Sequence, residues 1–214
     1  MPIWGESKIT WRQVLPPVLG AVAIACSVYV FHSCRSKGSA GAVRNSEQYR
    51  YYMGQIDSPD AATRAAVTRL LGELGEPAAV DAIRKRLQDD DPRVVGAACE
   101  ALGRLGDRES TETLFKHLDD QNPAIVAGAV DGLGALRYQP AVEPILAFLK
   151  SPNSRVRLAA VTALGLIGDK AALQPLQDLK LDPCAGLHPE PPEEERTRFS
   201  EAVGEAVDKL EAAQ

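Results

Sequence analysis

The stretch VRLAAVTALGLIGD, residues 156–169, contains the pattern that decides the fold. Its apolar side chains recur at intervals of three and four residues, which is the spacing of one face of an α-helix. The Leu-Gly pair inside it recurs every 31 residues toward the N-terminus. The pairs are Leu71-Gly72, Leu102-Gly103, Leu133-Gly134 and Leu164-Gly165. A fixed period of this length indicates an array of structural repeats.

Each copy of the period contains two helical patterns separated by turn signals. In the second copy, apolar side chains follow helical spacing over residues 94–105 and again over residues 111–118. Gly106-Asp107 interrupts the pattern between these stretches, and Asn122-Pro123 follows the second one. The copies span residues 58–89, 90–120, 121–151 and 152–182. We therefore expect an all-α fold, an α-solenoid of antiparallel helix pairs with a 31-residue period.

The glycines of the array fall into two sets. Gly75, Gly106 and Gly168 follow the first helix of their copies, where a left-handed residue commonly ends a helix. The third copy has Arg137 there, so we expect its turn to be less favourable by about 1 kcal/mol or to use another cap. The glycines of the Leu-Gly pairs lie inside helices, where each costs about 1 kcal/mol relative to alanine. A cost repeated in every copy predicts the close approach of a neighbouring helix.

The helical register continues beyond the four copies at both ends. Residues 46–57 reproduce the apolar stripe of a second helix, and residues 195–214 reproduce that of a first helix. A segment rich in proline and glutamate, residues 183–194, is inserted before the latter. We expect the two end segments to be capping half repeats, because a solenoid needs polar outer faces at its ends.

The N-terminal segment predicts a membrane anchor. Residues 14–31 contain no charged side chain, and basic residues flank them on both sides. After a short flank, residues 1–13, we expect a single-pass transmembrane helix over residues 14–32 and a flexible tether over residues 33–45. A lipoprotein modified at Cys26 is one alternative, and an ordinary cleaved signal peptide is the other.

Charge and composition exclude several classes of function. The 214-residue chain has a formal net charge of −5, which argues against a protein that binds phosphate backbones. The basic triplet at residues 84–86 does not recur in the other copies, so no nucleic-acid partner is expected. Residues 1–57 are basic and residues 183–214 are acidic, whereas the charges of the array between them nearly balance.

The sequence indicates no catalytic or metal site. Its three histidines and four cysteines show no metal-ligand spacing, and no Ser/His/Asp or Cys/His set can be assembled from it. The acidic triplet at residues 89–91 lacks the alternating ligands of a calcium loop, so a solvated turn between repeats is the favoured interpretation. We therefore expect no enzymatic activity, no cofactor and no metal ion.

The motif of residues 156–169 resembles the short bacterial HEAT-like repeats named after the phycobilin lyases. The resemblance covers residues 58–182 firmly and residues 46–57 and 196–212 weakly. It implies an α-solenoid in a bacterial protein and does not specify a function. The iron-dependent hydroxylases of this class use repeated His-Glu pairs, which this sequence lacks.

The resemblance also implies a ladder of polar contacts between repeats. The family's inward arginine of the first helix is present as Arg64 and Arg157. Val95 and Val126 replace it in the middle copies, so we expect the ladder to be broken in the centre.

The exposed side chains of the second helices are the candidate binding residues. We expect these helices to line the concave side of the solenoid, where such proteins bind protein segments. The candidates are Asp81, Lys85, Glu112, Lys116, Glu143 and Phe148. For Phe148 the alternative is that the insert at residues 183–194 covers it.

Taken together, these features predict a non-catalytic, membrane-tethered scaffold that binds a protein partner, with the bacterial inner membrane as its location. The alternative is a lyase-like or chaperone-like accessory that handles a tetrapyrrole or modifies a partner protein.

Overall fold

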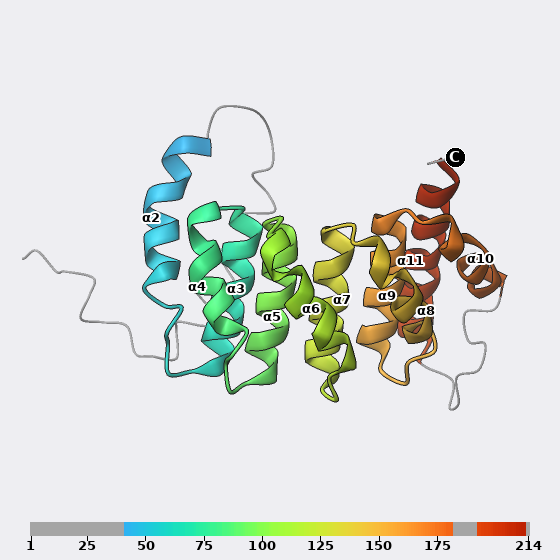
Figure 1. Cartoon of the computed structure of the whole chain (residues 1–214), viewed down its shortest axis with the longest axis horizontal. Helices are drawn as coiled ribbons and strands as arrows, with labels where there is room; N and C mark the ends of the chain where they lie inside the picture. The colour runs from blue at the N-terminus through green and yellow to red at the C-terminus, as the bar shows by residue number, and fades with distance from the viewer. Residues whose placement is uncertain (1–40, 182–191, 213–214) are drawn as a thin grey trace, which may run out of the picture. The chain divides into compact units, whose positions relative to one another are not determined.

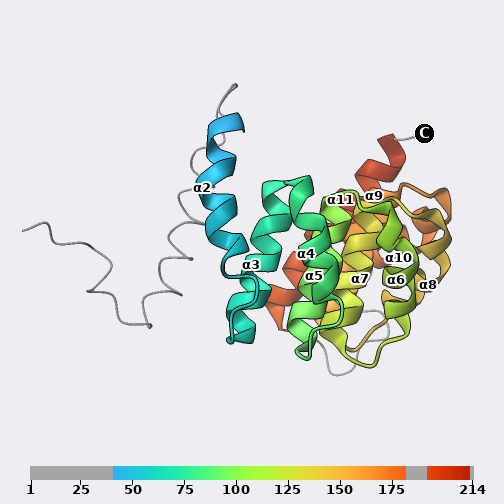
Figure 2. The ribbon, with the colours of Figure 1, turned by 60° about the vertical axis from the view of Figure 1, so that its left-hand side comes forward.

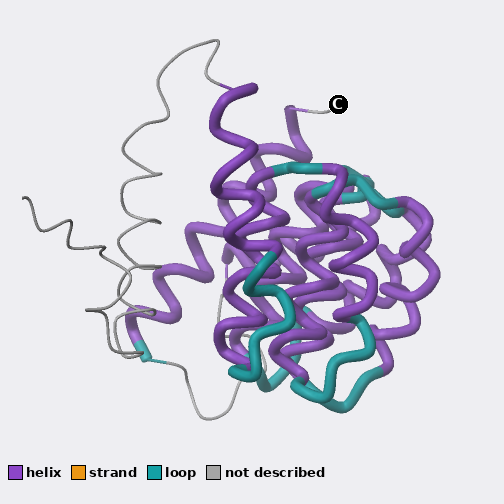
Figure 3. Tube along the Cα trace, turned by 90° about the vertical axis from the view of Figure 1, so that its left-hand side faces the viewer, coloured by secondary structure: helices purple, strands orange, loops and turns teal. Residues whose placement is uncertain are grey.

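The computed structural model describes residues 41–181 and 192–212, which form helices with short connections (Figure 1). No strand occurs in this described part of the chain, as the colouring of Figure 3 shows. The all-α solenoid predicted from the period is confirmed. The predicted flank, the membrane anchor and the tether up to residue 40 lie outside the described residues, whereas residues 41–45 of the predicted flexible tether are helical. Within the described ranges, no helix is both long enough and apolar enough to span a membrane.

Each repeat contributes a first helix and a shorter second helix, and successive repeats lie side by side (Figures 1 and 2). The first helices are α3 (Ala61–Leu74), α5 (Pro92–Arg104), α7 (Pro123–Ala135) and α9 (Ser154–Ile167). The second helices are α4 (Val80–Arg86), α6 (Thr111–Lys116), α8 (Val142–Phe148) and α10 (Leu173–Leu181). One turn of 3₁₀ helix precedes each second helix, at Pro77–Ala79, Arg108–Ser110, Gln139–Ala141 and Lys170–Ala172. The flanking helices are α2 (Gly41–Met53) and α11 (Glu193–Ala212).

The start of every first helix is fixed by the same kind of capping side chain. Asp60, Asp91, Asn122 and Asn153 follow one another at the 31-residue period, and each accepts a hydrogen bond from a backbone N–H in the first turn of its helix. A short polar side chain at this position satisfies a donor that the helix itself leaves unpaired. The period therefore sets the helix boundaries as well as the apolar faces.

Two columns of aliphatic side chains form the centre of the core. Both columns follow the 31-residue period, one on the first helices and one on the second. Their members are all fully buried: Leu71, Leu102, Leu133 and Leu164 on the first helices, and Ile83, Leu114, Ile145 and Leu176 on the second. Burying each of these side chains contributes roughly 1.5–3 kcal/mol. All eight belong to one hydrophobic cluster, so the core is continuous through the four repeats.

The glycines of the Leu-Gly pairs lie against the backbone of the next first helix, as predicted. A methyl group added to Gly72 would lie 2.7 Å from Ala101, and one added to Gly134 would lie 2.6 Å from Ala163. At the centre of the array Gly103 lies against the backbone of Gly132. No side chain larger than hydrogen fits these contacts without a shift of one helix.

The cap glycines also behave as the sequence predicts. Gly75, Gly106 and Gly168 adopt φ values of 68°, 73° and 79°. Arg137 keeps the same left-handed conformation, with φ of 53°, instead of using another cap. A side chain in this region costs roughly 1–2 kcal/mol, so the third turn is the strained one.

The helices form two layers. We call α3, α5, α7, α9 and α11 the first-helix layer and α4, α6, α8 and α10 the second-helix layer. From α3 to α9, neighbours in the first-helix layer pack closely along their length, α9 and α11 share a smaller contact, and neighbours in the second-helix layer touch at few points. The two layers therefore differ in how closely their neighbouring helices pack.

One cavity extends across the first-helix layer. Arg69 of α3 and Arg155 of α9 line it together, although α5 and α7 lie between their helices. We call this hollowed face of the first-helix layer the concave side. The sequence placed the binding surface on the second helices instead, and that placement stays a prediction.

Polar contacts join the second helix of one repeat to the turn of the next. Arg84 of α4 donates to the buried carboxylate of Asp107 at 2.8 and 2.5 Å, and Ser110 donates to the same carboxylate at 2.5 Å. The Arg84 hydrogen bonds hold the pKa of Asp107 below its usual value. One period later an edge-to-face pair of rings replaces the ion pair, with the centroids of Phe115 and Tyr138 5.9 Å apart.

The inward arginines make the contacts that the resemblance implies. Arg64 donates to Asp89 at 2.8 and 2.7 Å and to the carbonyl oxygens of Ser58 and Pro59. Asp89 is nearly buried, with 5% of its side chain exposed, so the expectation of a solvated turn is wrong for this carboxylate. In the middle copies the replacing valines lie in the core, so the ladder is broken there as predicted.

We expect Gly103→Ala to lower the free energy of unfolding by about 1–3 kcal/mol, because its methyl group overlaps the backbone of Gly132. The matched control is Gly204→Ala in α11, where no atom lies within 4 Å of the added methyl group. This control gains up to about 1 kcal/mol of helix propensity. Urea unfolding compares the two variants, and equal stabilities would contradict the backbone contact between α5 and α7.

Candidate functional site

The structure places the predicted binding residues on the second-helix layer. Asp81 and Lys85 lie on α4, Glu112 and Lys116 on α6, and Glu143 on α8, and all five side chains are exposed. Phe148, at the end of α8, is half-buried and packs against the core. Among the described residues, no two of these six form an ion pair with each other. Their role in binding stays a prediction.

One cavity touches this set. It has a volume of about 510 Å³ and lies beside the turn that follows α7, lined by Glu112, Arg137 and Tyr138 among others. The insert that the alternative places over Phe148 falls mostly outside the described residues. Two further cavities of the described residues lie on the concave side.

The concave side carries a network of charged side chains on α3 and α5. Arg69 Nε donates to Glu100 Oε2 at 3.2 Å, and Arg104 lies 2.7 Å from the other oxygen of Glu100. Arg104 also donates to Glu73 at 3.2 Å. Arg69 and Glu100, like Glu73 and Arg104, are one period apart, so the network follows from the register. These ion pairs fix the side chains that border the groove.

Asp131 continues the column of Arg69 and Glu100 onto α7. It is half-buried and has no hydrogen bond or ion pair among the described residues. Burial and the nearby carboxylate of Glu100 raise the pKa of Asp131 to about 7. Arg155, Arg104 and Arg69 oppose this rise without contacting the carboxylate. A half-buried carboxyl group without a partner is unusual in a folded protein.

The first concave cavity has a volume of about 210 Å³ and is shared by four first helices. Three arginines, Arg69, Arg93 and Arg155, line it from α3, α5 and α9. The rest of its lining consists of the small residues Ala62, Ala65, Gly96, Ala97 and Ala124. Because small side chains cover the floor and long cations border it, a ligand can approach the helix backbones closely between positive charges.

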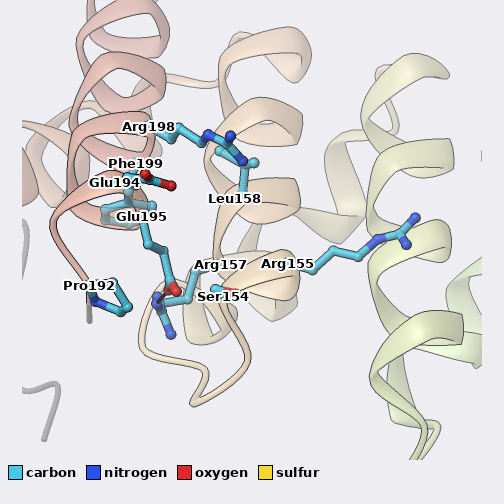
Figure 4. A pocket seen from close by; sticks show the side chains of 9 residues that line it. All are labelled: Ser154, Arg155, Arg157, Leu158, Pro192, Glu194, Glu195, Arg198 and Phe199. Carbon is cyan, nitrogen blue, oxygen red and sulfur yellow. Dashed lines mark hydrogen bonds and ion pairs between the residues drawn. The ribbon is translucent and has the colours of Figure 1, made fainter. Parts of the chain in front are cut away.

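The second concave cavity has a volume of about 420 Å³ and lies between α9 and α11 (Figure 4). Arg157 is fixed at its edge by an ion pair with Glu195 and by hydrogen bonds to the carbonyl oxygens of Ser151 and Pro152. The guanidinium group also lies 5.9 Å from the centroid of the Phe199 ring. Arg157 is therefore part of the wall of this cavity and is not available to a ligand.

Arg155 connects the two cavities, because its side chain lines both. Figure 4 shows it extending from α9 toward α7, away from the other residues of the second cavity. Arg198 of α11 lines the second cavity only and extends toward α9. Neither guanidinium group has a hydrogen bond or ion pair with any described residue, so both are free to bind a ligand.

The sequence reasoning missed this surface, although its signal is present. The positions of Arg93 and Arg155 share one column of the period, and those of Glu100 and Asp131 share another. Charged side chains at recurring positions of otherwise alanine-rich helices indicate a solvent-facing groove. Charged residues are more frequent on the second helices, so the prediction placed the binding residues there.

The described residues offer no site for a metal ion or a reactive thiol. No three His, Cys, Asp or Glu side chains within the described ranges gather closely enough to hold a metal ion. Cys99 is fully buried, and burial raises the pKa of its thiol to about 12. The chemistry of the concave side is therefore that of charged and apolar contact.

A two-layer array of helix pairs with a concave groove defines the class of α-solenoid repeat proteins. Residues 54–129 and 111–186 both match the family of HEAT repeats, and together they cover more than half of the chain. The chain therefore belongs to the HEAT-repeat family. No curated protein matches its sequence.

Solved structures resemble the chain in fold. The complex of CpcE and CpcF of phycocyanin lyase from Nostoc sp. PCC7120 matches with a TM-score of 0.54 and 20% identity, over 82% of this chain and 66% of that chain. A designed armadillo repeat protein in complex with the peptide (KR)4 matches with a TM-score of 0.45 and 17% identity, over 73% of this chain and 80% of that chain. At these identities the likeness extends to the fold alone.

We expect the stability contribution of Asp131 to decrease as the pH rises from about 4 to about 7. The folded chain holds the Asp131 proton up to about pH 7, whereas an unfolded aspartate releases it near about pH 4. Stability therefore falls in this window by about 1.4 kcal/mol for each pH unit between the two pKa values.

Asp131→Asn removes this dependence, so its stability relative to the native chain increases from about pH 4 to about pH 8. Urea unfolding across this range measures the difference. Asp81→Asn, which removes the exposed carboxylate of α4, is the matched control. A difference between Asp131→Asn and the native chain that stays constant with pH would contradict the raised pKa.

Proposed function

We propose that the protein is a non-catalytic scaffold that binds a segment of a partner protein on its concave first-helix layer. The observation that supports this most directly is the pair of concave cavities that share Arg155. They extend across α3, α5, α7, α9 and α11, which is a longer path than a compact small molecule occupies. Extended concave surfaces of solenoids suit extended protein segments.

The lining of the two cavities favours a polypeptide ligand. Alanine and glycine between the charged side chains let a peptide backbone lie close to the helices. The arginines stand apart along the groove, so successive side chains of one segment can reach them in turn. The tetrapyrrole alternative stays a prediction, because the likeness to phycocyanin lyase is one of fold.

A membrane tether is the second part of this proposal. The uncharged run of residues 14–31 is long enough for a single transmembrane helix, and basic residues flank it. We place the protein in the bacterial inner membrane on this basis. A tether would hold the groove close to the membrane and so raise the local concentration of a membrane-bound partner.

We expect the full-length chain to remain in the membrane fraction after alkaline carbonate extraction. The double variant Val22→Asp/Val28→Asp moves to the soluble fraction, because two buried charges cost about 5–7 kcal/mol in a transmembrane helix. Cys26→Ser distinguishes a transmembrane helix from a lipid anchor. The variant stays in the membrane fraction if residues 14–32 span the membrane, and it moves to the soluble fraction if a lipid on Cys26 is the anchor. Extraction of the native chain into the soluble fraction would refute the tether.

Site-specific photocrosslinking in native cells tests the binding surface. A photoreactive residue is placed at Ala62, which is exposed and lines the first concave cavity. The matched position is Ala147, which is exposed on α8 in the second-helix layer. We expect a discrete protein adduct from position 62 and none from position 147. Adducts from position 147 alone would contradict the proposal and indicate that the second helices form the binding surface.

A further inference from the structure

The second concave cavity exists because α9 and α11 are in contact over only part of their length. Gly165 lies against Ala206, where an added methyl group would be 2.9 Å from the alanine Cβ. Toward the N-terminal ends of the two helices the cavity separates them, from Ser154 on α9 to Phe199 on α11. Between α5 and α7 the equivalent space is closed, because the backbones of Gly96 and Gly128 are in contact.

An exposed leucine lies in this opening. Leu158 is 38% exposed, although it lies on a first helix of the array. The same column of the period holds Ala65, Gly96 and Ala127 in the other copies, which are small and buried. A large apolar side chain at the one open position offers a contact for an apolar group of a ligand.

Around Leu158, the positively charged side chains outside ion pairs outnumber the negatively charged ones. Arg157 and Glu195 neutralise each other through their ion pair. The free side chains of the lining are then Arg155 and Arg198 on the positive side and Glu194 on the negative side. An arginine holds a carboxylate through paired hydrogen bonds, and such charge-assisted bonds contribute more than neutral ones. Two arginines without partners therefore favour an anionic ligand.

We infer that the cavity between α9 and α11 binds an acidic segment of a partner protein in which a carboxylate side chain stands next to a leucine-sized apolar side chain. A carboxylate meets Arg198, the apolar side chain packs on Leu158, and Arg155, which extends toward α7, holds a further acidic side chain of the same segment. This inference rests on the proposed function and names the kind of segment that the groove selects. The cavity volume of about 420 Å³ lies within the roughly 300–1,000 Å³ of binding pockets.

The test uses the full-length chain in a mild detergent and three fluorescein-labelled peptides of equal length. One alternates glutamate and leucine, one alternates lysine and leucine, and one alternates glutamate and serine. Fluorescence anisotropy gives their dissociation constants. We expect the glutamate-leucine peptide to bind at least about tenfold more tightly than either of the others, because each loses one of the two contacts.

Charge reversal supplies the decisive variant. Arg155→Glu/Arg198→Glu weakens the glutamate-leucine peptide by at least about tenfold and reverses the preference toward the lysine-leucine peptide. Both arginines are exposed and make no contact that the fold needs, so the variant keeps its native thermal unfolding. Arg108→Glu/Lys170→Glu, in the exposed turns that precede α6 and α10, is the matched control and leaves all three affinities unchanged.

The outcomes separate the inference from the proposed function. Two results would contradict the inference that the partner segment is acidic. One is tighter binding of the lysine-leucine peptide than of the glutamate-leucine peptide by the native chain. The other is equal affinity of the native chain and the Arg155→Glu/Arg198→Glu variant for the glutamate-leucine peptide. An adduct at position 62 would still support the concave surface in that case. Loss of both the adduct and the peptide selectivity would overturn the scaffold proposal as well.

Discussion

Backbone contact between successive first helices is the constraint on which the rest of the structure depends. Gly72, Gly103, Gly134 and Gly165 each lie against an alanine or glycine of the next first helix. The contact brings neighbouring first helices closer together than neighbouring second helices. Arginines of separate repeats line one cavity along this closely packed layer. A glycine costs helix stability at each position, and the packing it permits outweighs that cost.

The sequence predicted the helices and most of the side chains that cap and pack them, because each of these features recurs in the four copies of the period. Helix starts, buried leucines and the left-handed caps could all be read from recurring residues. Arg137 follows the same column, since it keeps the left-handed conformation with the less favourable turn that the sequence predicted as one of two outcomes. The layer that carries the two cavities sharing Arg155 could not be predicted, because it depends on how neighbouring helices pack and not on the pattern within one helix. The arginine groove was missed for this reason.

The repeats are joined by interchangeable contacts. Arg84 and Asp107 join the first two repeats through an ion pair, and Phe115 and Tyr138 occupy the same positions one period later. An aromatic pair buries no charge. This junction therefore avoids the free-energy cost of removing charged groups from water, which a buried ion pair incurs. The array thus keeps its register through different kinds of side-chain contact.

The unequal tightness of the first-helix contacts has a mechanical consequence. The joint between α5 and α7 is closed by glycines at two levels, so neither helix can tilt without one backbone entering the other. The joint between α9 and α11 is held at Gly165 and Ala206 and opens into a cavity beyond them. The middle of the array is therefore stiff and its last joint is compliant. A force applied to α11 deforms the cavity beside Arg155 first, while the central repeats keep their shape.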